Sequence, residues 1–113
     1  MDDDVRAYID AIKPTHRPLF DRLSGLIYEA FPEATVGIAY KMPTFKVGGC
    51  SLYVGVWSHG LSIYGWADGR DGGFSLRHPE MTSGKGTIRL PLAAGDLIAD
   101  DELRDLVRGA LAA

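Results

Sequence analysis

The apolar residues of this chain change their spacing twice, and that change constrains the fold more than any other feature. In residues 5–12, 19–31 and 103–111 they recur every three or four positions, which predicts three amphipathic helices. Between residues 36 and 65, and again at 87–90, they alternate, which predicts strands with one buried face. We therefore expect an α+β two-layer sandwich, with the N-terminal helices and the C-terminal helix packed on one face of an antiparallel β-sheet.

Local signals support the boundaries of these elements. Aspartates precede the first and last helices, where carboxylates complement the helix dipole, and Pro32 ends the second helix. Gly48-Gly49 predicts a two-residue hairpin turn between two strands. Residues 67–82 are rich in glycine and polar residues, so we expect a long loop with one helical turn.

The length and composition fit a single domain spanning residues 1–113. The chain has 113 residues, of which 46% are apolar, enough for a modest core without metal or disulfide support. The one cysteine, Cys50, excludes an internal disulfide, favours a reducing compartment and is expected to be a buried thiol. The acidic N-terminus lacks the basic start of a signal peptide, and no apolar run reaches membrane-spanning length. We expect a cytoplasmic protein without a membrane partner.

Charge is unevenly distributed along the chain. The formal net charge is −3, yet residues 34–95 carry six basic against three acidic side chains, so the middle is basic and both ends are acidic. Strand alternation assigns the residues of this middle segment to two faces. The side chains expected to face the helices are apolar: Val36, Ile38, Tyr40, Phe45, Val47, Leu52, Val54, Val56, Leu61, Ile63, Ile88 and Leu90.

The opposite face is predicted to be basic and aromatic. Its expected members are Lys41, Thr44, Lys46, Tyr53, Trp57, Tyr64, Trp66, Thr87 and Arg89. Gly37, Ala39 and Gly55 on this side would leave a shallow groove. Such a face suits a small anionic ligand with a planar part, a partner protein or a second copy of the chain, with nucleic acid the least favoured partner. The alternative is an ordinary solvated face with cross-strand aromatic pairs.

Residues 82–91, TSGKGTIRLP, superficially resemble a phosphate-binding loop. That motif needs a glycine five positions before Gly84, a hydroxyl after Lys85 and a helix next; here Pro79, Gly86 and a predicted strand occupy these places. A nucleotide loop is therefore excluded. A weaker anion site built from Lys85, Thr87 and Arg89 remains as an alternative.

No catalytic motif is present, so we predict that the protein is not an enzyme. The three histidines, His16, His59 and His78, lack the spacing of a zinc site, and we expect them to face solvent. The segment 68–72 lacks the ligands of a calcium loop, and no serine or cysteine lies in a nucleophile motif.

Acidic residues near the helix ends form a candidate metal site. Glu29 and Glu33 lie four positions apart, and the N-terminal aspartates could approach other acids if helix ends pack together. Oxygen ligands of this kind can bind iron weakly. The candidate metal ligands are Asp2, Asp3, Asp4, Glu29 and Glu33. The alternative is helix capping and a solvated acidic surface.

Two segments resemble a known family. They are VGIAYKMPTFK at residues 36–46 and GKGTIRLPL at residues 84–92, which contain the patterns Tyr-x-Met-Pro-x-Phe and Lys-Gly-Thr-Ile-Arg-Leu-Pro. Together with the first helix they resemble the YdhG-like family of small bacterial domains, most of them of unknown function. The candidate ligand-binding residues are those of the two motifs and of the basic face: Tyr40, Lys41, Met42, Pro43, Phe45, Lys46, Tyr53, Tyr64, Lys85, Thr87 and Arg89.

The resemblance implies a frataxin-like fold and a role as an iron chaperone, with iron–sulfur or haem assembly proteins as partners. Iron delivery is accordingly the leading hypothesis, and a ligand-binding sheet face is the alternative. The chain departs from the family at residues 67–82, where members carry a charged helix and this chain has a glycine-rich segment. The family motifs lie on the predicted sheet rather than on acidic helices, so the resemblance bears on fold more than on metal.

Overall fold

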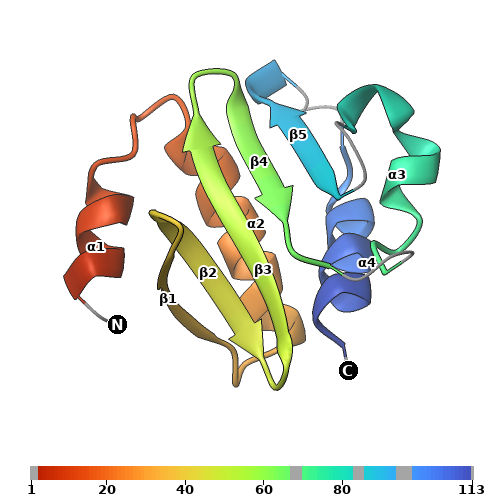
Figure 1. Ribbon diagram of the computed structural model, residues 1–113. Coiled ribbons are helices and arrows are strands. Elements are labelled where there is room, and N and C mark those ends of the chain that lie inside the picture. The colour runs from red at the N-terminus through yellow and green to blue at the C-terminus, as the bar shows by residue number, and fades with distance from the viewer. Residues whose placement is uncertain (1–2, 67–69, 83–85, 94–97, 113) are drawn as a thin grey trace.

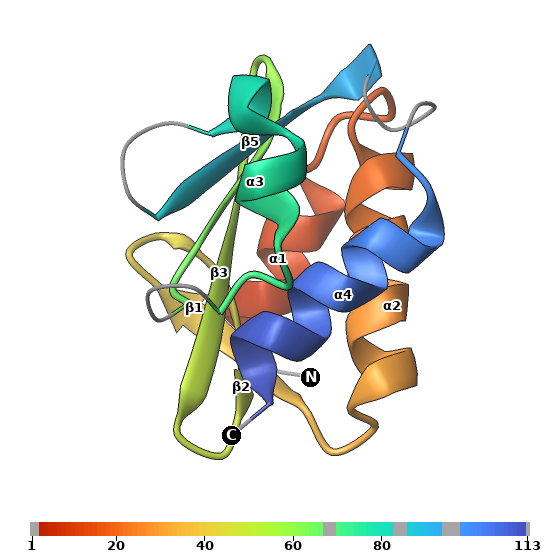
Figure 2. The same cartoon turned by 90° about the vertical axis from the view of Figure 1, so that its right-hand side faces the viewer.

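A computed structural model describes residues 3–66, 70–82, 86–93 and 98–112. It has two layers, a five-stranded antiparallel sheet and a layer of helices on one of its faces (Figure 1). The helices are α1 (Asp3–Asp10), α2 (Arg17–Ala30) and α4 (Asp100–Leu111). Figure 2 shows the sheet close to edge-on, with these three helices on the same side. The predicted α+β sandwich is confirmed.

The strands follow one another in space in the order of the chain, β1-β2-β3-β4-β5. Their bounds are β1 Thr35–Ala39, β2 Met42–Val47, β3 Cys50–Trp57, β4 Gly60–Tyr64 and β5 Thr87–Pro91. Two-residue turns join the first four strands, including the predicted Gly48-Gly49 turn. A short helix, α3 (Phe74–Arg77), and a 3-10 turn, η1 (Pro79–Met81), lie between β4 and β5. None of the helices within the described residues combines the length and apolar character that crossing a bilayer requires.

The core lies between the sheet and the helices, as the alternation predicts. On the strands Leu52, Val54 and Ile63 have no exposed surface, and on the helices Ile27 and Leu106 have none either. These side chains come from elements far apart in the sequence, because each strand and each helix contributes one apolar face. Cys50 is half-buried and packs against this core as a free thiol.

Two aromatic residues were assigned to the wrong face. Tyr40 was expected to point at the helices, but it lies in the turn between β1 and β2 and is 81% exposed. Trp66 was expected on the opposite face, but it is half-buried and packs against the core. Both residues follow the end of a strand, where the alternation of side chains no longer holds.

Pro43 shapes one end of the sheet. The pairing of β2 with β3 runs from Val47–Cys50 to Thr44–Tyr53 and ends there. The next residue, Pro43, has no N–H to donate to a neighbouring strand. β3 continues beyond this point, and the backbone N–H of Val56 donates instead to the Tyr8 hydroxyl of α1, 3.0 Å away. The first helix is thus attached to the sheet where the pairing of β2 with β3 ends.

Candidate functional site

The strands contribute no acidic side chain to the sheet face that carries no helix. None of the five strands contains an aspartate or a glutamate, nor do the two-residue turns that join β1 to β4. Lys46 and Arg89 are exposed on this face, and neither forms an ion pair with any residue that the structure describes. An anion arriving here meets cations whose charge is not already neutralised.

Two tyrosines stand opposite each other in the middle of this face. Tyr53 on β3 pairs in register with Tyr64 on β4. Lys46 lies opposite Ser51, which makes it a diagonal neighbour of Tyr53. Arg89 lies opposite Ser62, which makes it a diagonal neighbour of Tyr64. Diagonal neighbours in a sheet are about 7–8 Å apart, within reach of long side chains, so each tyrosine has one cation beside it.

The turn between β1 and β2 adds a third tyrosine under backbone strain. Tyr40 and Lys41 both adopt positive φ, at 52° and 63°, the conformation that two-residue hairpin turns require. Such turns favour Asn-Gly, because a larger side chain in the left-handed region is strained. The Tyr40 ring nevertheless extends to within 5.7 Å of the Tyr53 ring, measured between centroids. The turn therefore holds an exposed ring over the sheet.

The groove expected along the glycines is filled at Gly55 and open at Gly37, where a Cβ atom would meet nothing within 4 Å. A Cβ atom placed on Gly55 would lie 2.7 Å from Trp57 Nε1 and 3.6 Å from Met42 Sδ. Two long side chains thus occupy the space that the missing side chain leaves. Thr44 is buried on the same face, with 1% of its surface exposed. The face therefore bears rings and cations around space that is filled at Gly55 and open at Gly37.

The structure sorts the residues of the family motifs. Tyr40, Lys41, Met42 and Lys46 lie on the face or on its bordering turn, and so does Thr87, which pairs with Tyr64. Lys85 lies outside the described residues.

Two motif residues were wrongly placed in the site. Phe45 is 2% exposed in the core, where its ring meets that of Tyr28 edge to face with centroids 6.0 Å apart. Pro43 is buried and ends a strand pairing. Both alternate away from the exposed side chains of β2, so they serve the fold.

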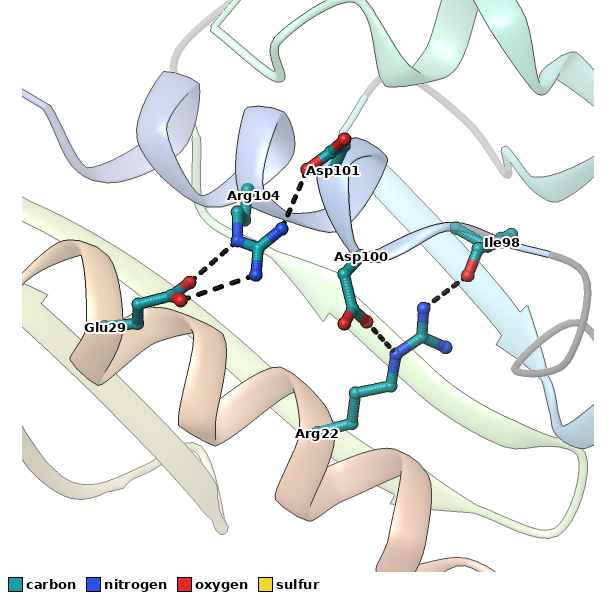
Figure 3. A network of polar contacts seen from close by, with 6 residues as sticks. All are labelled: Arg22, Glu29, Ile98, Asp100, Asp101 and Arg104. Carbon is teal, nitrogen blue, oxygen red and sulfur yellow. Dashed lines mark hydrogen bonds and ion pairs between the residues drawn. The ribbon is translucent and has the colours of Figure 1, made fainter.

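The acidic helices form ion pairs with arginines across the helical layer, as Figure 3 shows. Glu29 of α2 accepts from Arg104 of α4, with Oε2 2.7 Å from Nε, and Arg104 also reaches Asp101 at 2.7 Å. Arg22 bonds Asp100 and the Ile98 carbonyl nearby. The hydrogen bond from Arg104 holds the pKa of Glu29 below its usual value.

The expected metal ligands are not gathered into a site. Throughout ranges 3–66, 70–82, 86–93 and 98–112, no three His, Cys, Asp or Glu side chains are placed to hold a metal ion. Glu29 is engaged by Arg104, Glu33 is exposed beyond the end of α2, and Asp3 and Asp4 occupy the first turn of α1. Asp2 lies outside the described residues. The alternative, helix capping and a solvated acidic surface, fits these positions better, and the ion pair of Glu29 with Arg104 was not expected.

Two of the three histidines do not face solvent as expected. His16 is 6% exposed, with Nδ1 2.9 Å from Thr15 Oγ1 and Nε2 3.3 Å from the Ser58 carbonyl. His78 lies with Nε2 2.8 Å from Glu102, and the bond lowers the pKa of that carboxyl. His59 is exposed, as predicted, beside the Ser62 hydroxyl. The sequence pattern gave no sign of these distant partners.

A pocket of about 380 Å³ was missed by the sequence analysis. Its walls come from the end of α1, the segment that follows it and the last residues of β3. The two N-terminal segments lie 40 or more positions before the residues of β3, so no local motif signals the pocket. The one hint of this contact was Tyr8, which lies on the apolar face of α1 and carries a hydroxyl that needs a hydrogen-bond partner when buried.

Comparisons with family models, with curated proteins and with solved structures give no match to this chain.

Proposed function

We propose that the outer face of the sheet binds a small anionic ligand that carries a planar ring. The observation that carries this proposal is the turn between β1 and β2. Tyr40 and Lys41 occupy two positions where Asn-Gly would be less strained, and residues held in left-handed backbone cost of order 1–3 kcal/mol each. Strain of this kind is concentrated at functional sites. The turn therefore carries two side chains that its backbone conformation does not favour.

The charge of the face supports an anion, and the rest of the molecule favours a small one. Lys46 and Arg89 lack acidic neighbours on the strands, so they attract negative groups. A long polyanion would also approach the acidic helices, and the sequence pI is about 5.5 rather than the strongly basic value of most nucleic-acid-binding domains. A compact ligand engages the cations without that repulsion.

The tyrosines provide aromatic surface against which the planar ring of the ligand can stack. A planar group lying on Tyr53 can contact the Tyr40 ring as well, because the two centroids are 5.7 Å apart. The negative group then extends toward Lys46 or, across Tyr64, toward Arg89. The ligand class is a ring with an attached phosphate or carboxylate.

A three-probe NMR titration tests the proposal. Adenosine monophosphate has both parts, adenosine has the ring alone and inorganic phosphate has the charge alone. We expect the first to shift amides of β3, β4 and β5 and to bind at least about tenfold more tightly than either fragment. Equal binding of the three probes, or shifts confined to the helices, would contradict the proposal.

Matched substitutions locate the binding. Tyr40→Ala, Lys46→Gln and Arg89→Gln should each weaken adenosine monophosphate, whereas Arg108→Gln, an exposed helix arginine with the same charge change, should not. Tighter binding of a short single-stranded oligonucleotide than of the monophosphate would identify a nucleic-acid site. Light scattering that reports a dimer would identify a second copy of the chain on this face. Either result would replace the small ligand as occupant.

Membership of the YdhG-like family and iron delivery remain predictions from the two motifs. Glu29 would have to leave Arg104 before it could bind a metal ion. Anaerobic titration with ferrous iron tests this second function. Binding that is lost in the Glu29→Gln, Glu33→Gln variant would favour it over the sheet-face ligand.

A further inference from the structure

We infer that the pocket between α1 and the end of β3 binds a small aromatic carboxylate, at a site that adjoins the sheet face at Trp57 but does not include Tyr40, Tyr53 or Tyr64. The pocket holds about 380 Å³, within the lower part of the range of about 300–1,000 Å³ found for ligand sites. Tyr8, Ile12 and Val56 give it apolar walls, and the half-exposed Trp57 ring borders it. Such walls fit a ring or a short apolar chain.

The polar groups of the pocket select the charge of the ligand. Both ring nitrogens of His16 already have partners, Thr15 Oγ1 and the Ser58 carbonyl, so this wall has no acceptor to offer. The Tyr8 oxygen accepts the Val56 N–H, which leaves its own O–H as a donor.

Lys13 contributes three further donors and a positive charge. It belongs to no ion pair within the described part of the chain, and no acid is among the described residues that line the pocket. Only the exposed Ser58 hydroxyl can act as either donor or acceptor. Among the side chains that line the pocket, donors outnumber acceptors around apolar walls, which suits a carboxylate attached to an apolar body.

The way the pocket is built makes it a fixed feature of the fold. It exists because Pro43 ends the pairing of β2 and β3 and lets α1 approach the end of β3. His16 then bonds the Ser58 carbonyl across the molecule and holds the segment after α1 against the turn between β3 and β4. The site is therefore formed before a ligand arrives.

The test compares phenylacetate with phenylacetamide, which has a similar shape and no charge. Indole N–H signals in NMR spectra report Trp57, with Trp66→Phe used to assign them. We expect phenylacetate to shift the Trp57 signal and the Tyr8, Val56 and Ser58 amides, and to bind at least about fivefold more tightly than the amide. Equal affinity of the two compounds, or no binding by either, overturns the inference.

Two variants fix the position. Lys13→Gln should remove the preference for phenylacetate over the amide, while Arg108→Gln, an exposed residue of α4 with the same charge change, should keep it. Ala11→Phe places a ring in the pocket from an exposed position and should abolish binding of both compounds. Unchanged binding in the Ala11→Phe variant, with a folded-protein spectrum, overturns the inference as well.

Discussion

The helical layer and the outer face of the sheet treat charge in opposite ways. In the helical layer, carboxylates and guanidinium groups meet across α2 and α4, as Glu29 does with Arg104 and Asp100 with Arg22. On the sheet face, Lys46 and Arg89 have no acid on any strand to meet. Paired charges stabilise the contact between two elements and largely neutralise each other. Unpaired charges of one sign create an electrostatic potential that attracts a ligand of the opposite sign. The difference therefore directs attention to the sheet.

The two faces of β2 give the largest contrast to measure. Phe45→Ala removes a buried ring and should cost about 3–5 kcal/mol of unfolding free energy, because a cavity replaces it beside Tyr28. Lys46→Ala, the next residue on the opposite face, should change stability by less than about 0.5 kcal/mol. Urea unfolding of both variants measures the contrast. A large cost for Lys46→Ala would show that the cation supports the fold and break the comparison.

A buried acid beside the helical layer comes next in size. Asp71 is 7% exposed and accepts from the backbone N–H groups of Gly73 and Ser75, which begins α3. Asp71→Ala should cost about 1–2 kcal/mol at neutral pH, as loss of a helix cap does. Urea unfolding measures it, with Asp71→Asn as the control that retains an acceptor oxygen.

The pH dependence of that cost follows from the pKa of Asp71. Burial raises this pKa, but hydrogen bonds from Ser75 and Gly73 outweigh burial and lower it below its ordinary value of 3.8. The ionised form therefore stabilises the fold fully above pH 3.8, and the contribution is lost as pH falls through the depressed pKa. The difference between the native protein and Asp71→Ala should shrink there. A difference that stays constant with pH would mean that the carboxylate charge has no part in the cap.

The strained turn between β1 and β2 gives a third test, in which stability and ligand binding should change in opposite directions. Tyr40→Asn with Lys41→Gly gives the turn its preferred sequence and should stabilise the protein by about 1 kcal/mol net, because the relieved strain is partly offset by the greater unfolded-state entropy of glycine and by loss of the Tyr40–Tyr53 contact. The same variant should lose the anionic ligand, because the exposed ring is gone. Thermal unfolding and the adenosine monophosphate titration measure both effects. A variant that is less stable than the native protein would remove the argument from strain.

The smallest change in stability is expected for Arg104→Gln. The residue is on the surface, where ion pairs are screened by solvent. Its effect should appear instead as a rise in the pKa of Glu29 toward the ordinary value of 4.5, since the Arg104 hydrogen bond is the main cause of the lowered value. NMR titration of the Glu29 carboxyl measures this. An unchanged pKa would mean that Arg104 and Glu29 do not pair in solution.

The architecture was predictable because it depends on periodicity. Alternation placed Leu52, Val54 and Ile63 in the core, and the spacing of the helical stripes placed Ile27 and Leu106 against them. The failures lie where periodicity stops. Tyr40 sits in a turn whose positive φ values no pattern marked.

The candidate site was only partly predictable, because its chemistry depends on distant partners. Lys46, Tyr53, Tyr64 and Arg89 could be assigned to one face by counting residues along strands. The bond from His16 to Ser58 joins segments 42 positions apart, and the pair of Glu29 with Arg104 joins segments 75 positions apart. Side chains that meet across the fold leave no trace in local spacing.

The hydroxyl of Tyr8 helps to protect the sheet from pairing with strands of other copies. Where the pairing of β2 with β3 ends next to Pro43, the last residues of β3 would present open backbone groups, and an open strand edge is a template for pairing with another chain. One phenolic oxygen takes the Val56 N–H, and the body of α1 lies over the gap. The helix α1 thereby covers a part of β3 that β2 does not pair, and this stretch of backbone is closed to strands of other copies.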